Sequence, residues 1–370
     1  MQYADFGKTG CRVSRLGFGC MRLPLTDEKV YASIDEEKAC RMIRTAIDSG
    51  VNYVDTAYFY HDGESEKVVG KALKDGYREK VYLATKLPMG SVEKTEDFDR
   101  LLNDQLKKLD TDHIDFYLFH ALNAERWETV KRLGLMEKME EAKKDGRIRH
   151  CGFSFHDDLQ AFERIVNEYT NCEFCQIQLN YLDTDYQAGL EGLRLASRKG
   201  LGVVVMEPLR GGMLAKDDSE RMANFAPGTN AVAAALDFIW DMEEVSLLLS
   251  GMSAPEQVAE NLLLADNARA NSLTPAHKAQ YAAAKKQYDQ KGLIPCTGCQ
   301  YCQPCEQGVD IPAIFEAWNL TAEHSRREVK KRMPDIEERI SRCIGCGQCE
   351  SKCPQQIEII SGLKRIKDSF

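Results

Sequence analysis

Eight of the fourteen cysteines are gathered in two short stretches between residues 296 and 353 of the 370-residue chain. The second stretch, CIGCGQCESKCP, has the spacing C-x₂-C-x₂-C-x₃-C-P and runs from Cys343 to Pro354. With this spacing one loop can place three thiolates around one face of a four-iron cluster, and the fourth cysteine can reach a second cluster. The stretch therefore predicts iron–sulfur ligands. Zinc is the alternative, but it is usually bound by two separate CxxC pairs.

The first stretch, CTGCQYCQPCEQGVDIP, departs from this pattern at its fourth cysteine. Cys305 follows Cys302 after two residues rather than three, and Glu306 stands where proline is expected. Residues 311–342 have a helical pattern, so the whole region resembles helical dicluster ferredoxin domains. The ferredoxin resemblance implies two four-iron four-sulfur (4Fe-4S) clusters with crossed ligands. The two ligand sets are Cys296, Cys299 and Cys302 with Cys353, and Cys343, Cys346 and Cys349 with Cys305.

A second set of reactive side chains follows apolar segments much earlier in the chain. Asp55 and Tyr60 lie in VDTAYFYHDGESE, Lys86 lies in LATKLP, and His120 ends DFYLFH. A lysine ammonium beside a tyrosine stabilises the phenolate, and an aspartate would keep that lysine charged and in place. A histidine nearby can orient or polarise a carbonyl group. Together these residue types make a tyrosine able to give a proton to a carbonyl oxygen as hydride reaches the carbon.

The elements that must position these residues alternate along the chain up to about residue 265. Short runs rich in Val, Ile, Phe and Tyr predict strands, and longer stretches of helical period, such as 35–50 and 128–146, predict helices between them. Eight such repeats indicate a closed (β/α)₈ barrel; an open doubly wound sheet is the alternative, but no GxGxxG follows the first strand. The predicted strands are 16–19, 53–56, 81–86, 114–120, 149–154, 175–179, 202–206 and 245–251.

Two further segments complete the predicted organisation. Residues 2–15 form a small hairpin that caps the barrel floor, and residues 274–291 form a helix that opens at Thr274-Pro275. The cysteine-rich part starts after Gly292. We therefore expect a barrel domain over residues 1–290 and a mostly helical iron–sulfur domain over residues 291–370.

The stretch DTAYFYHDGESEKVVGKAL resembles the signature of the aldo-keto reductases, and ATK and DFYLFH resemble that family's next two landmarks. The resemblance covers roughly residues 1–270. It implies a TIM barrel that binds a nicotinamide cofactor without a Rossmann domain and reduces an aldehyde or a ketone. It further implies that Tyr60 is the general acid, that Lys86 and Asp55 tune it, and that His120 orients the substrate carbonyl.

The same resemblance implies a cofactor pocket. Its residues are Ser154 and Gln176 at the nicotinamide carboxamide, Met206 at the stacking position, Leu209 and Gly211 along the pyrophosphate, and Glu260 and Asn261 at the adenine. Gly251 and Gln257 occupy positions where basic residues usually hold the 2′-phosphate of NADP. Because a neutral pair forms no charge-assisted bonds to that phosphate, the cofactor can be either NADP or NAD.

Composition limits the partners and the location. The net charge of −9 argues against nucleic acid as a partner, and no run of about 18 apolar residues predicts a membrane span. The first ten residues have no apolar signal core, so we expect a cytoplasmic protein in which cysteines stay reduced. The six cysteines outside the two stretches are then expected to be buried apolar residues.

The whole chain resembles the ferredoxin-fused aldo-keto reductases of bacteria and archaea. The first hypothesis is a reductase of a small carbonyl substrate, whose clusters are structural, regulatory or oxygen-sensing. The second is an electron-transfer protein whose clusters exchange electrons with a redox partner protein. The third is a non-catalytic nicotinamide sensor, which the intact set of Asp55, Tyr60, Lys86 and His120 disfavours.

Overall fold

The chain divides into two compact units in the computed structural model, which describes residues 1–28, 30–216, 219–322 and 325–370. The first unit comprises residues 1–208 and 235–273, and the second comprises residues 209–234 and 274–370. The predicted boundary at residue 290 falls inside the second unit. Within the described residues, no helix combines the length and the apolar character needed to cross a membrane.

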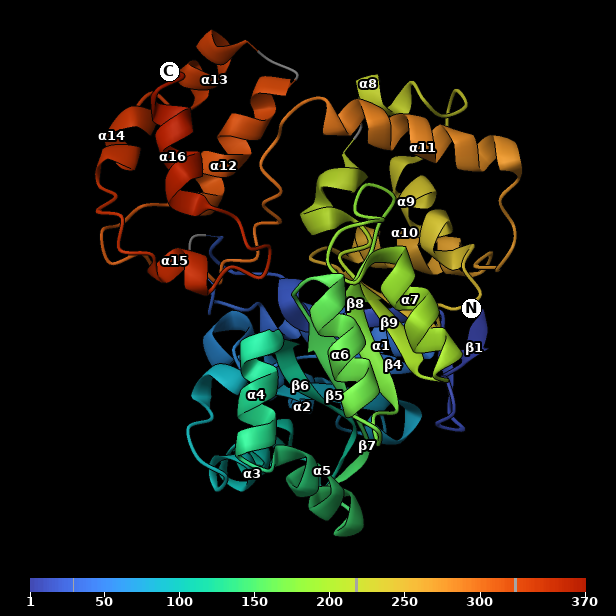
Figure 1. The fold of residues 1–370 in the computed structure, drawn as a ribbon. Coiled ribbons are helices and arrows are strands. Elements are labelled where there is room, and N and C mark those ends of the chain that lie inside the picture. The colour runs from blue at the N-terminus through green and yellow to red at the C-terminus, as the bar shows by residue number, and fades with distance from the viewer. Residues whose placement is uncertain (29, 217–218, 323–324) are drawn as a thin grey trace. The chain divides into compact units, whose positions relative to one another are not determined.

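Eight parallel strands close into a barrel in the first unit, which confirms the predicted fold (Figure 1). Each strand pairs with its sequence neighbours, and β10 closes the barrel by pairing with β3. The predicted segments all form strands, with ends that shift by a few residues. The strands are β3 (Leu16–Gly19), β4 (Tyr53–Asp55), β5 (Tyr82–Leu87), β6 (Ile114–Leu122), β7 (Ile148–Phe155), β8 (Phe174–Gln178), β9 (Gly202–Met206) and β10 (Leu247–Gly251).

Helices cover the outside of these strands and bury their apolar faces against them (Figure 1). The predicted single helix over 128–146 is wrong, because the chain forms two helices that meet at Gly134. Its φ of 61° lies in the left-handed region, which glycine adopts without steric cost and which ends a helix. The helices of this unit are α1 (Glu36–Asp48), α2 (Ser65–Ala72), α3 (Asp97–Leu109), α4 (Ala124–Arg132), α5 (Leu135–Lys144), α6 (Leu159–Glu168), α7 (Gly189–Arg198) and α10 (Pro255–Ala265).

The N-terminal end of the barrel is closed by the predicted hairpin, β1 (Tyr3–Asp5) with β2 (Arg12–Ser14). Phe6, in the turn that follows β1, is fully buried. Its ring contacts Tyr53, Phe116 and Phe174, which lie at or near the N-terminal ends of three strands, at centroid distances of 4.8–5.9 Å. The hairpin therefore plugs the end of the barrel opposite the strand termini that carry the reactive residues.

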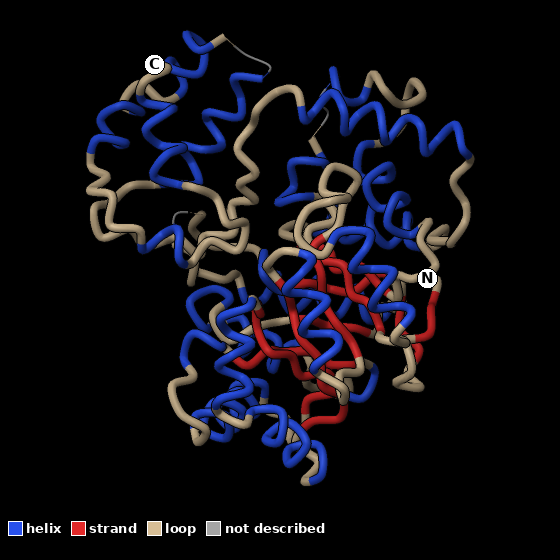
Figure 2. The backbone as a smooth tube through the Cα atoms, viewed as in Figure 1, coloured by secondary structure: helices blue, strands red, loops and turns tan. Residues whose placement is uncertain are grey.

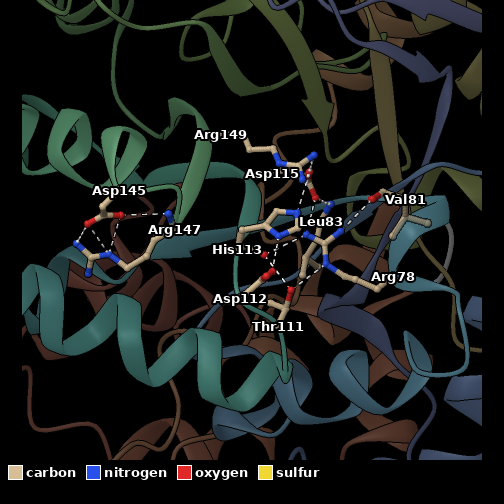
Figure 3. Close-up of polar contacts among 10 residues, drawn as sticks. All are labelled: Arg78, Val81, Leu83, Thr111, Asp112, His113, Asp115, Asp145, Arg147 and Arg149. Atoms are coloured by element: carbon tan, nitrogen blue, oxygen red, sulfur yellow. Dashed lines mark hydrogen bonds and ion pairs between the residues drawn. The ribbon is translucent and has the colours of Figure 1, made fainter.

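A buried carboxylate ties the strands together at this same end of the barrel (Figure 3). Asp115 of β6 accepts hydrogen bonds from Arg78 Nη2 at 2.7 Å and from the Leu83 N–H at 2.9 Å. Arg149 of β7 lies 3.2 Å from the other oxygen of Asp115. One side chain therefore joins the strands β5, β6 and β7 through charge-assisted bonds.

The second unit consists of helices and loops in its described residues, as Figure 2 shows for its cysteine-rich part. Helix α11 begins at Pro275, directly after its N-cap Thr274, which agrees with the predicted opening; the Thr274 side chain accepts the His277 N–H. Apolar residues of α12 and α16 form the core that the cysteines surround. The helices are η5 (Arg210–Ala215), α8 (Ser219–Met222), α9 (Ala231–Trp240, which continues into the first unit), α11 (Pro275–Asp289), α12 (Ile311–Asn319), η6 (Leu320–Ala322), α13 (Arg326–Arg332), α14 (Ile336–Ser341), α15 (Gln348–Ser351) and α16 (Ile359–Lys367).

Candidate active site and cluster sites

The four reactive residues predicted in the barrel lie together at the C-terminal ends of three consecutive strands. Lys86 of β5 donates a hydrogen bond to Asp55 Oδ1, at the end of β4, at 2.7 Å, and another to the Thr56 carbonyl at 2.7 Å. The Lys86 ammonium lies 5.0 Å from the centre of the Tyr60 ring. The His120 ring lies edge-on to Tyr60 at 6.2 Å between centroids. All four side chains are buried.

Burial sets the protonation states around this group. It raises the pKa of Asp55, and the Lys86 ammonium opposes that change, so the carboxylate depends on its ion pair to stay charged. Burial also holds the pKa of His120 well below 6.5, and the positive charges of Lys86 and Arg126 lower it further. His120 is therefore a neutral imidazole at pH 7, able to form a hydrogen bond without adding a second positive charge beside Lys86.

The loop that carries Tyr60 is held by its neighbour His61, which the sequence analysis did not single out. His61 Nε2 accepts the Leu23 N–H at 3.1 Å, so the ring proton is on Nδ1, which donates to the Tyr31 carbonyl at 2.8 Å. The ring also stacks on Tyr31 at 4.5 Å. His61 and Asp62 both have φ of 53°. This left-handed pair turns the chain directly after Tyr60 and so fixes where the phenol lies.

A buried polar network supports β5 behind Lys86. Glu66 of α2 accepts hydrogen bonds from Thr85 Oγ1 at 2.7 Å and from Gln105 Nε2 at 2.6 Å. Gln105 also donates to the Lys86 carbonyl at 3.1 Å and accepts from Tyr117 Oη at 2.7 Å. The backbone on both sides of the Lys86 side chain is therefore anchored to α2 and α3.

The residues predicted to meet the nicotinamide lie on neighbouring strands. Ser154 of β7 is directly opposite Gln176 of β8, and its Oγ accepts the Ala121 N–H at 2.7 Å. Gln176 Nε2 lies 3.6 Å from the sulfur of Met206. Within the described part of the chain, the buried Gln176 Oε1 has no hydrogen-bond partner. A buried acceptor of this kind fits a ligand that brings amide hydrogens, as a carboxamide does.

The segment predicted to bind adenosine runs from β10 into α10. Asn261 is buried and donates to Ser250 Oγ at 2.8 Å, whereas Glu260 is half-buried. Gln257 is exposed, and its Oε1 accepts the Ser253 N–H at 2.7 Å. The structure adds Arg22, which sequence reasoning missed: its aliphatic carbons lie 3.3–3.4 Å from the Cβ position that a side chain at Gly251 would occupy.

Leu209 and Gly211, the residues predicted along the pyrophosphate, belong to the second unit. Gly211 has a φ of 64°, and a Cβ on it would lie 2.2 Å from the carbonyl oxygen of Thr297. Glycine is therefore required here by the close approach of the segment next to Cys296. This packing is a structural reason for the glycine that sequence reasoning did not supply.

The thiols near Cys302 come from both of the cysteine-rich stretches. Burial raises the pKa of the Cys302 thiol to about 12, and the neighbouring thiols Cys299, Cys296 and Cys353 raise it in the same direction. Of these neighbours, Cys353 comes from the distant stretch. Within the described residues, no three His, Cys, Asp or Glu side chains are placed as ligands of a single metal ion.

The other crossed set lines a pocket of its own in the second unit. The empty volume of this pocket, including solvent at its mouth, is about 560 Å³. Its wall includes Cys302 at one edge and all four thiols of the second predicted set, which are Cys305, Cys343, Cys346 and Cys349. A donor set of thiols around one pocket fits the chemistry of a 4Fe-4S cluster, which Cys thiolates hold.

The closed parallel barrel with reactive side chains at the C-terminal ends of its strands places the first unit in the (β/α)₈ class of oxidoreductases. The aldo/keto reductase family profile matches residues 15–231, and a 4Fe-4S dicluster domain profile matches residues 295–358. The chain therefore belongs to the aldo/keto reductase family and carries a C-terminal 4Fe-4S dicluster domain.

Individual relatives agree with this assignment. The oxidoreductase YrpG of Bacillus subtilis is 30% identical over 243 residues, which are 58% of this chain and 68% of YrpG. L-galactose dehydrogenase of Arabidopsis thaliana is 25% identical over 287 residues, which are 69% of this chain and 85% of that protein. The holo form of aldo-keto reductase AKR11C1 from Bacillus halodurans is similar in structure, with a TM-score of 0.65 and 26% identity over 77% of this chain and 96% of that one.

Proposed function

We propose that the protein reduces an aldehyde or a ketone with NADPH or NADH, with Tyr60 as the general acid. The observation that carries this proposal is the buried Lys86–Asp55 ion pair beside Tyr60 and His120. Burying a charge pair costs free energy of desolvation. An ammonium close to a phenol stabilises the negative charge that develops on that phenol. The family supports the same reaction class.

The nicotinamide cofactor, when bound, supplies the hydride that reaches the carbonyl carbon. Tyr60 passes its hydroxyl proton to the carbonyl oxygen, and the nearby Lys86 ammonium stabilises the phenolate that remains. Asp55 keeps Lys86 charged and oriented. His120, as a neutral imidazole, forms a hydrogen bond with the carbonyl oxygen and orients it toward Tyr60. Ser154 and Gln176 hold the carboxamide, and Met206 flanks them.

The choice between NADPH and NADH depends on the charges around the adenosine ribose. Gly251 and Gln257 supply none, but Arg22 covers Gly251. We place Arg22 in the role that a basic residue at 251 would have, so the protein accepts NADPH despite its neutral pair. A guanidinium forms paired charge-assisted bonds to a phosphate group, which an adjacent glycine cannot provide.

For the C-terminal part we propose two 4Fe-4S clusters with crossed ligands, held by residues 291–370. The neighbours of the Cys302 thiol support the set Cys296, Cys299, Cys302 and Cys353. The pocket lined by Cys305, Cys343, Cys346 and Cys349 supports the other set. Such clusters supply one-electron chemistry when they are present. Because all fourteen cysteines of the described chain are free thiols, we propose the reducing cytoplasm as the location.

Electron transfer to a partner protein is the second candidate function, and the exposure of one cluster site favours it. Cys346 is exposed, whereas the other seven thiols of the two sets are partly buried. Ile344, between Cys343 and Cys346, is 67% exposed. An exposed apolar side chain beside a solvent-accessible ligand suits brief contact with another redox protein.

One experiment separates the two functions. NADPH or NADH is added to anaerobically purified protein without substrate, and the visible iron–sulfur absorbance is followed. An unchanged absorbance together with aldehyde-dependent NAD(P)H consumption supports the reductase. Bleaching shows that the clusters take electrons from the nicotinamide and favours the electron-transfer function. If neither signal appears, both proposals are wrong.

A further inference from the structure

A cysteine, a histidine and a glutamate lie in line at the N-terminal end of the barrel, away from the four residues of the proposed active site. Cys11 Sγ is 3.5 Å from His150 Nε2, and His150 Nδ1 is 2.8 Å from Glu173 Oε1. The three residues come from the hairpin, from β7 and from the residue before β8. A nucleophile that contacts a base, with the base oriented by a third group, is the arrangement that activates thiols.

The protonation states of Glu173 and His150 follow from the contacts that these side chains make. Glu173 is held as an acceptor-only carboxylate: burial alone would raise its pKa, but bonds from His150, Lys143 and the Cys151 N–H lower it to about 2. His150 Nδ1 must then carry the proton, so Nε2 is left as an acceptor facing Cys11. The imidazole can therefore take the thiol proton and remain bonded to Glu173 as an imidazolium.

Neighbouring side chains hold Cys11, His150 and Glu173 in this geometry. The His150 ring stacks on Phe116 at 4.9 Å with planes 20° apart, and Phe116 in turn contacts the Phe6 plug. Lys143 donates to Glu173 Oε2 at 2.6 Å and fixes the carboxylate from the other side. Cys11 itself is partly exposed, whereas Cys20, Cys151, Cys172 and Cys175 are buried. Burial and the nearby Cys11 thiol raise the pKa of Tyr82.

We propose that Cys11 is a reactive thiol, activated by His150 and Glu173, that forms mixed disulfides with small disulfides. In this exchange Cys11 gives its proton to His150 Nε2, and the thiolate attacks one sulfur of the incoming disulfide. A new S–S bond forms at Cys11 while the old S–S bond breaks. The departing thiolate takes the proton back from His150, so the reaction needs no separate oxidant.

The test uses the full chain with its clusters, kept free of oxygen, and 2-hydroxyethyl disulfide as the probe. Peptide mapping by mass spectrometry measures the modification rates of Cys11 and Cys40 in the same sample. Cys40 is the matched control because it is also partly exposed and its thiol has only the Val68 carbonyl, at 3.8 Å, as a hydrogen-bond partner among the described residues. At pH 7 we expect Cys11 to react about tenfold faster than Cys40 or more.

Two variants test the roles of the partners. His150→Phe keeps a ring against Phe116 but removes the base, and we expect it to slow Cys11 by about tenfold while Cys40 is unchanged. Glu173→Gln keeps an acceptor for Nδ1 but no charge, and we expect a smaller loss. Equal Cys11 rates in the wild type and in a folded His150→Phe variant would overturn the proposal.

The wild-type protein alone also decides the question, should a variant fail to fold. Burial raises the pKa of Cys40, so between pH 8 and pH 6 its rate should fall by about a hundredfold as the thiolate disappears. Because His150 takes the thiol proton during the attack, the proposal predicts a fall of less than about tenfold for Cys11 over the same range. A Cys11 rate that falls in parallel with that of Cys40 contradicts the proposal.

Discussion

Lys86 bonds Asp55 at 2.7 Å while its ammonium stays 5.0 Å from the centre of the Tyr60 ring. The buried Lys86 ammonium thus bonds the Asp55 carboxylate and also lies near Tyr60, the proposed acid. Tyr60→Phe keeps the ring beside the ammonium but has no proton to give. We expect it to lower aldehyde-dependent NADPH consumption by about 10²- to 10⁴-fold. Cofactor binding, measured by NADPH fluorescence, should change little.

Tyr58→Phe is the matched control for this variant. Tyr58 lies two residues earlier, and its ring packs beneath Lys108 rather than beside Lys86. It should retain near-normal turnover. Normal turnover in Tyr60→Phe would remove Tyr60 from the role of acid.

The second prediction concerns the adenosine end of the cofactor. Arg22→Ala should lower the ratio of kcat/KM for NADPH to that for NADH by about tenfold, because a charge-assisted contact to the 2′-phosphate is lost. Gln257→Arg should raise the same ratio, since Gln257 is exposed and already near the loop of Ser253. Gln257→Leu adds no charge and is the control. If neither charge change alters this ratio, the 2′-phosphate is bound elsewhere.

The third prediction concerns the crossed ligands. Cys353→Ser should reduce bound iron and acid-labile sulfide by about half, because the first cluster loses one of its four thiolates. Cys305→Ser should affect the other cluster, so the two variants should leave different residual electron paramagnetic resonance signals. If Cys353→Ser removes the cluster bound by Cys343, Cys346 and Cys349 instead, the ligands are not crossed.

The fourth prediction concerns the buried carboxylate in Figure 3. Asp115→Asn removes the charged partner of Arg78. Water cannot readily replace that partner, because the Asp115 and Arg78 side chains are only 2% and 15% exposed. We expect the free energy of unfolding to fall by roughly 2–3 kcal/mol, measured by urea denaturation. Asp112→Asn is the control, since that side chain is 93% exposed and its loss should not change stability measurably. Equal stability of both variants would contradict a structural role for the Arg78–Asp115 pair.

The fifth prediction is a loss of stability in mild acid. Burial lowers the pKa of His156 from 6.5 to about 4, so the folded protein binds fewer protons there than the unfolded chain does. The contribution of His156 is complete above pH 6.5 and is lost as the pH falls toward about 4, with a total of roughly 3 kcal/mol. His156→Gln should flatten the fall in unfolding free energy over this window. An unchanged slope would show that other groups cause it.

The barrel and its reactive residues were predictable because their signals are local. Each strand is a short apolar run, and Asp55, Lys86 and His120 lie at or near the C-terminal ends of three of them, where the chemistry of such barrels lies. The cysteine spacing is equally local. The break at Gly134 was missed because an isolated glycine within a helical pattern is usually tolerated.

Features that depend on contacts between distant segments were not predictable. His61 is held by Leu23 and Tyr31, and nothing beside it in the sequence predicts those contacts. Cys11 and His150 are brought together only when the hairpin closes the barrel. Arg22 reaches Gly251 only because β3 pairs with β10 in the closed sheet.

The approach of Gly211 to the Thr297 carbonyl joins two stretches of the second unit that are far apart in the sequence. The segment after β9 packs so closely against the segment with the first cluster cysteines that residue 211 has no room for a Cβ. A chimera that joins the iron–sulfur part to another barrel must therefore also keep residues 209–234, including Gly211. The unit that holds the cysteines thus includes a stretch of chain that comes before the last barrel strand, β10.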